Sequence, residues 1–92
     1  MTYIYIINVV APIHNIPSRR VGYNKYPIVC ISQKTLEEVL TNEQVRTSLE
    51  STLELVGDHV FDKATVSIRV VDGDAHITDY EKPINEILSL WR

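Results

Sequence analysis

The chain has 92 residues, 45% of them hydrophobic and 23% charged, and its formal net charge is −3. This length fits one domain with one modest core and excludes a multidomain enzyme. The composition is typical of a globular protein and excludes a disordered tail or a low-complexity linker. We therefore expect a single domain over residues 1–92.

Membrane and secretory signals are weak. The longest apolar stretch, residues 3–13, is too short to cross a bilayer and contains Asn8. No basic segment precedes it, as a secretory signal would require. One cysteine excludes a disulfide framework and suits a reducing compartment, so we expect a cytoplasmic protein without a membrane partner.

The N-terminal segment alternates over residues 2–10, with apolar side chains on both faces: Tyr3, Tyr5 and Ile7 on one, Ile4 and Ile6 on the other. This pattern predicts a central strand buried on both sides. Pro12 and Pro17 bracket a predicted loop that continues through Gly22. The apolar run 28–31 after Pro27 predicts a second strand.

Two helices are predicted next. Ser32 is a candidate cap for a short helix ending at Leu40. Thr41 and Gln44 have the spacing of a capping box for a longer helix, which Gly57 is placed to end. Apolar side chains recur at helical spacing along this longer helix, at Val45, Leu49, Leu53 and Val56.

The C-terminal third predicts a hairpin and a last helix. Residues 65–71 alternate as a strand, Asp72-Gly73 favours a tight turn, and residues 75–78 form a short return strand. Pro83 suits the first position of the last helix, with Asp79 or Tyr80 upstream of it. The apolar side of this helix consists of Ile84, Ile87, Leu88 and Trp91. The order predicts an α+β fold, a mostly antiparallel four-stranded sheet with two to three helices packed on one face.

Catalytic and metal motifs are absent from the sequence. His14, His59 and His76 do not combine with Cys30 at zinc-ligand spacing, and Asp72-Gly73-Asp74 lacks the remaining ligands of a calcium loop. Cys30 lies within an apolar strand, which favours an inert buried thiol. No nucleophile elbow, P-loop or dinucleotide fingerprint occurs. We expect no enzyme, no cofactor and no metal.

Acidic and basic residues are unevenly distributed along the chain. Residues 1–34 carry four basic and no acidic residues, whereas residues 35–92 carry twelve acidic residues against five basic ones. On the longer helix, Glu43, Glu50 and Glu54 fall within about 40° of one another, opposite the apolar stripe. Together with following segments they predict an acidic, partner-binding surface of Glu43, Glu50, Glu54, Asp58, Asp62, Asp72, Asp74, Asp79, Glu81 and Glu86. Such a surface can imitate the charge pattern of DNA, and we expect it to occupy a basic cleft of a DNA-binding protein.

Other interpretations stay open. The chain is alternatively a small adaptor or subunit that binds a protein through an apolar surface or a strand edge. A nucleic-acid binder would use the basic segment, with Arg19, Arg20, Lys25 and Lys34 among Tyr23 and Tyr26, although the net charge of −3 opposes it. A homodimer is expected from the doubly apolar first strand and Trp91.

The short, cysteine-poor, Ile-, Tyr- and Asn-rich chain with an acidic second half resembles the small early proteins of T4-type bacteriophages. Among these it is similar to the Arn-type anti-restriction DNA mimics. The resemblance concerns size, composition and charge layout, and transfers no functional residue. It implies an inhibitor that acts in the bacterial cytoplasm on a restriction nuclease or another host DNA-binding protein, without binding nucleic acid itself.

Overall fold

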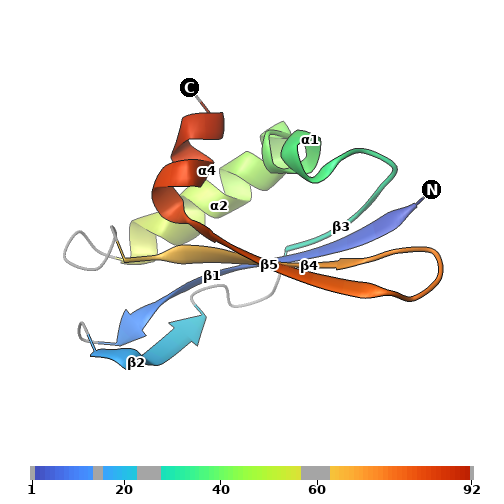
Figure 1. Cartoon of the computed structure of the whole chain (residues 1–92). Coiled ribbons are helices and arrows are strands. Elements are labelled where there is room, and N and C mark those ends of the chain that lie inside the picture. The colour runs from blue at the N-terminus through green and yellow to red at the C-terminus, as the bar shows by residue number, and fades with distance from the viewer. Residues whose placement is uncertain (1, 14–15, 23–27, 57–62, 92) are drawn as a thin grey trace.

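In the described part of the chain, five strands form one antiparallel sheet, and three helices lie on one side of it (Figure 1). The computed structural model describes residues 2–13, 16–22, 28–56 and 63–91, with only the backbone described at 13, 16–22 and 55–56. The strands are β1 (Tyr3–Ile13), β2 (Ile16–Gly22), β3 (Ile28–Ser32), β4 (Thr65–Val71) and β5 (Ile77–Pro83). The helices are α1 (Leu36–Leu40), α2 (Glu43–Val56) and α4 (Ile84–Leu90), which confirms the predicted α+β class.

The sheet is at most four strands wide, as predicted, because two of its five strands share one edge of β1. β4 pairs with one edge of β1 over residues 4–10, and β5 pairs with the far side of β4. On the other edge, β3 pairs with residues 3–7 of β1 and β2 pairs with residues 10–13. β1 is therefore the central strand.

β2 replaces part of the predicted loop between Pro12 and Gly22, so that prediction is wrong. Its backbone pairs Gly22 with Val10 and Arg20 with Pro12, and the register shifts between Pro12 and Ile13. Pro17 does not prevent this pairing, because a proline is tolerated on an edge strand. The unpaired edge of the long β1 gives the segment a backbone partner that local turn signals do not reveal.

The core lies between the helices and one face of the sheet. Tyr5, Ile7 and Val9 of β1 are buried there, as are Val66 and Ile68 of β4. The helices contribute Val39 and Leu40 from α1, Val45, Leu49 and Leu53 from α2, and Ile84 and Ile87 from α4. No helix covers the other face in the described part of the chain (Figure 1). The prediction that β1 is buried on both sides is therefore wrong, and Ile4 remains 38% exposed.

Both helix starts differ from prediction. β3 extends through Ser32, which pairs with Tyr3, so α1 begins later and its capping box joins Thr35 and Glu38. Thr41 ends α1. The side chain of Asn42 caps α2 by accepting hydrogen bonds from the N–H groups of Gln44 and Val45 at 3.0 and 3.3 Å. The predicted end of the longer helix at Gly57 lies outside the described residues.

The β4–β5 hairpin is present, but β5 starts two residues later and runs five residues further than the predicted return strand of residues 75–78. The turn has a three-residue loop, since the N–H of Asp72 donates to the carbonyl of His76 at 3.1 Å. His76 closes this loop and precedes β5, so it does not lie on the strand where it was predicted. Ala75 has φ 61°, the left-handed position of this turn type. Pro83 ends β5 and directly precedes α4, close to the predicted start.

Among the described helices, none combines the length and the apolar character needed to cross a membrane.

Candidate functional site

The uncovered side of the sheet, which we call the open face, is the most distinctive surface of the molecule. Side chains alternate between the two sides of a strand, so the residues that flank the buried Tyr5, Ile7 and Val9 point away from the helices. The strand pairing then places the following residues on the open face: Ile4, Ile6, Asn8 and Val10 of β1, Thr65, Ser67, Arg69 and Val71 of β4, Val29 and Ile31 of β3, and Ile77, Asp79, Glu81 and Pro83 of β5.

One end of the open face is apolar across the whole width of the sheet. The register aligns one residue from each of four strands in a row: Ile31, Ile4, Val71 and Ile77. Val29 and Ile6 lie next to this row, paired with each other. Ile31 is 70% exposed, and Val29 and Ile77 are each 59% exposed. Apolar side chains left this exposed and contiguous on a sheet are typical of an interaction surface.

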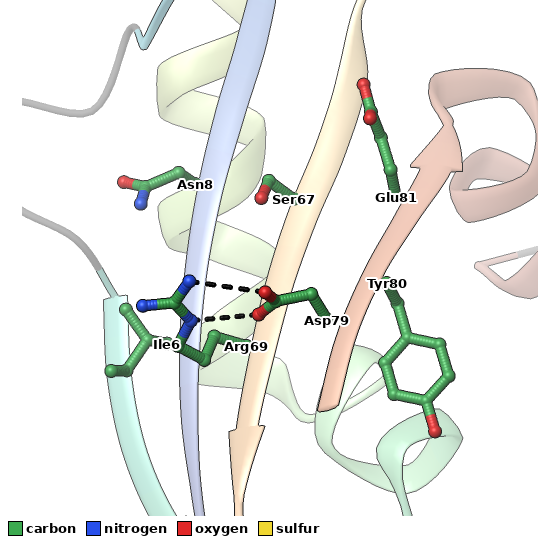
Figure 2. A pocket seen from close by; sticks show the side chains of 7 residues that line it. All are labelled: Ile6, Asn8, Ser67, Arg69, Asp79, Tyr80 and Glu81. Atoms are coloured by element: carbon green, nitrogen blue, oxygen red, sulfur yellow. Dashed lines mark hydrogen bonds and ion pairs between the residues drawn. The ribbon is translucent and has the colours of Figure 1, made fainter. Parts of the chain in front are cut away.

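A polar centre borders the apolar end. Arg69 of β4 and Asp79 of β5 form a bidentate ion pair (Figure 2). Nε and Nη2 of Arg69 donate to Oδ1 and Oδ2 of Asp79 at 2.8 and 3.2 Å. The hydrogen bonds from Arg69 hold the pKa of the Asp79 carboxyl below its ordinary value, and the same contacts raise the pKa of Arg69. Both groups stay in their charged forms at neutral pH.

A shallow hollow of about 470 Å³ lies over this polar centre. Its lining is mixed: Ile6, Asn8, Ser67, Arg69, Asp79, Tyr80 and Glu81. Figure 2 shows Asn8 and Ser67 on neighbouring strands beside the ion pair, whereas the ring of Tyr80 points away from them. Glu81 accepts a hydrogen bond from the hydroxyl of Thr65 at 2.8 Å. The hollow therefore offers amide, hydroxyl and charged groups beside an apolar rim, a combination that favours contact with a protein surface.

The predicted acidic surface is divided between the two sides of the molecule. On the helix side, Glu43, Glu50 and Glu54 are exposed on α2, opposite its buried stripe, as the helical spacing predicts. Arg46 pairs with Glu50 at 2.8 Å and compensates part of this charge. Asp79 and Glu81 lie instead on the open face.

Glu86 and Asp72 of the predicted acidic surface have local partners, and two other predicted positions lie outside the described residues. Glu86 of α4 pairs with Lys82 at 3.1 Å. Asp72 accepts from the N–H groups of Asp74 and His76 at 2.9 and 3.0 Å, and so closes the hairpin turn. The predicted positions Asp58 and Asp62 are not described, nor are His14, His59, Tyr23, Lys25 and Tyr26.

The hairpin turn also groups three potential metal ligands. One ligand atom each from Asp72, Asp74 and His76 lies within 4.8 Å of the others. The imidazole Nδ1 of His76 is 3.6 Å from the carboxylate of Asp72. Because Asp72 already serves the turn as an acceptor, the grouping has a sufficient structural explanation.

Trp91 and Cys30, both singled out from the sequence, have structural roles or positions that differ from the predictions. Trp91 donates from its indole N–H to the carbonyl of Leu40 at 2.9 Å, and the guanidinium of Arg46 lies 5.4 Å from its ring centre. It therefore holds the end of α4 against α1 and is half-buried, not part of a free patch. Cys30 of β3 is half-buried on the helix side of the sheet, less deeply than predicted.

Sequence reasoning missed the open face as a surface. The available signal is the apolar character of both alternating sets over residues 3–7, which predicts burial on both sides, together with the apolar run of residues 28–31. Comparison with protein-family models, with curated proteins and with solved structures found no match for this chain. The resemblance to Arn-type phage proteins stays a prediction.

Proposed function

We propose that this chain is a non-enzymatic binding module that recognises another protein through the open face of its sheet. The observation that carries the proposal is the apolar row of Ile31, Ile4, Val71 and Ile77, in which all but the half-buried Val71 are exposed. This is the adaptor alternative raised by the sequence. Its partner presents an apolar surface with polar groups placed to meet the Arg69–Asp79 pair.

The charge of the open face supports a protein partner over nucleic acid. Its described strand side chains include one guanidinium, Arg69, and two carboxylates, Asp79 and Glu81. Phosphate binding requires an excess of basic groups. Because that guanidinium is already paired with Asp79, the side chains described on this face offer no such excess.

The energetics favour a partner that covers more than the three most exposed aliphatic side chains. Ile31, Ile77 and Val29 expose 70, 59 and 59% of their surface. Since full burial of such a side chain contributes about 1.5–3 kcal/mol, covering these three contributes roughly 3–6 kcal/mol in total. Association costs about 4–15 kcal/mol. The three side chains therefore supply little net affinity alone, and contacts to Ile6 and the polar hollow would add to it.

The test is capture of partners by the immobilised full chain from nuclease-treated bacterial lysate, with identification by mass spectrometry. We expect Ile77→Lys to lose a partner that the wild-type chain retains at high salt. Thr78→Lys is the matched control, because Thr78 is an exposed neighbour on the same strand whose side chain lies on the other side of the sheet. Capture that survives Ile77→Lys, in a variant with unchanged circular dichroism, would contradict the proposal.

We propose as a second candidate the inhibitor with an acidic, DNA-like surface, acting in the bacterial cytoplasm on a restriction nuclease or another DNA-binding protein. The exposed positions of Glu43, Glu50 and Glu54 on one side of α2 favour it. It makes the opposite prediction in the same assay. The partner would elute as salt rises, would be lost by Glu43→Lys/Glu54→Lys, and would be retained by Ile77→Lys.

A further inference from the structure

The two outer edges of the sheet differ in a way that indicates a second copy of the chain. β5 forms one edge and carries Asp79, Glu81 and Lys82 before ending at Pro83. Charges and proline on an edge strand prevent it from pairing with another strand. β3, at the other edge, has the sequence IVCIS without any charge or proline. In the described part of the chain β3 pairs with β1 alone, so its outer edge is open.

We propose that two copies of this chain associate along β3, edge to edge and antiparallel, and join their sheets into one. A two-fold axis perpendicular to the sheet keeps the open faces of both copies on the same side. Directly opposed residues of neighbouring strands have side chains on the same side. The symmetry therefore allows only registers in which one residue of β3 lies opposite its own copy.

Cys30 is that residue when the five residues of β3 pair along their full length, because it is the middle of Ile28–Ser32. The same register places Val29 opposite Ile31 of the second copy, and Ile31 opposite the second Val29. These are two of the most exposed apolar side chains described, at 59 and 70%. Each gains an apolar cross-strand neighbour on the side where its own sheet ends.

The dimer has a consequence for the open face. Val29 and Ile31 pair within each copy with Ile6 and Ile4 of β1. Around the two-fold axis, these four residues and their copies form one continuous apolar patch. The Arg69–Asp79 pairs lie on the far side of β1, so they border this patch at both ends. The dimer itself does not depend on the proposed partner binding.

The size of the contact sets its strength. A strand of five residues is about 17 Å long at 3.4 Å per residue. Pairing along that length buries less than the roughly 1,200–2,000 Å² of a stable interface. We therefore expect a reversible dimer whose population rises with concentration in the micromolar range and above.

The first test is the mass of the full chain in reducing buffer, measured by sedimentation over a concentration series. We expect it to rise from 10.5 kDa toward twice that value. Val29→Lys/Ile31→Lys and Val29→Glu/Ile31→Glu should each be monomeric, and their equimolar mixture should dimerise again. Ile77→Lys, at the opposite edge, should dimerise like the wild type. A chain that stays monomeric at every concentration would overturn the proposal, as would a dimer broken by Ile77→Lys, because that result indicates face-to-face packing.

The second test uses Cys30, the one cysteine of the chain. Opposed residues in an antiparallel pair have Cα atoms about 4.5–5.5 Å apart, within the range that a disulfide spans. Copper phenanthroline should therefore cross-link the dimer in the native state but not in urea. Cys30→Ser should abolish the cross-link and leave the reversible dimer intact. A native dimer that does not cross-link would refute the register centred on Cys30. Since Ile77→Lys is expected to lose the partner but keep the dimer, the two proposals fail separately.

Discussion

The hydroxyl of Tyr5 offers a sensitive probe of how the central strand is held. Tyr5 is 2% exposed, and its hydroxyl donates to the backbone carbonyl of Lys34 at 2.6 Å. Lys34 lies in the connection between β3 and α1, so this hydrogen bond links β1 to that connection. Tyr5→Phe keeps the ring and removes the donor. We expect a loss of about 1 kcal/mol in the free energy of unfolding, the usual net value of one such bond.

The same substitution has a pH signature. Burial, aided by neighbouring groups that include Tyr3, raises the pKa of Tyr5 above its ordinary value of 10.0. The folded state therefore holds the phenolic proton more tightly than the unfolded state, and this contribution to stability is complete below pH 10. It is lost as the pH rises through the higher pKa of the folded state. Above pH 10 the free energy of unfolding of the wild type should fall more than that of Tyr5→Phe. The difference in free energy of unfolding between the two proteins should therefore narrow as the pH rises.

Urea unfolding followed by far-ultraviolet circular dichroism, at neutral pH and at several values above pH 9, measures both effects. Tyr80→Phe is the control, because the Tyr80 side chain is on an edge strand and 44% exposed. It should change stability by less than about 0.5 kcal/mol at neutral pH. If Tyr5→Phe is as stable as the wild type at neutral pH, or if the difference stays constant into the alkaline range, the reasoning is wrong.

Two further predictions concern local geometry. Asn42→Ala should lower the free energy of unfolding by about 1 kcal/mol, because it removes the acceptor for two N–H groups of α2; an unchanged value in urea titration would show that Asn42 is not the cap. Ala75→Gly should raise it by up to about 1 kcal/mol, because Ala75 has φ 61° and glycine adopts this conformation without a steric penalty. Thermal unfolding of that variant checks the sign, and a lower melting temperature would contradict the assigned turn.

Much of the fold follows from local pattern. Helical spacing of Val45, Leu49 and Leu53 identified the buried stripe of α2, and alternation identified the inward residues of β4. These patterns are reliable because burial of one side of a helix or strand imposes its period on the sequence. The exposed positions of Glu43, Glu50 and Glu54 followed from the same period.

Local signals failed where another segment supplied the deciding contact. Pro12 and Pro17 predicted a loop, yet the free edge of β1 pairs with β2 there. Asp72-Gly73 predicted the hairpin but not the type of its turn, because the non-glycine residue with positive φ is Ala75. Ser32 is a competent helix cap, but its pairing opposite Tyr3 keeps it in β3.

The open face shows most clearly what the sequence determines and what only the tertiary structure decides. The sequence determined that β1 and β3 carry apolar side chains on both sides, which is compatible with burial and with exposure alike. Only the tertiary structure decided between them, because the described helices all pack on the same side of the sheet and leave Ile4, Val29, Ile31 and Ile77 uncovered. Alternation within a strand records which side chains share a side. It does not record whether another layer covers that side, because coverage depends on where distant helices pack.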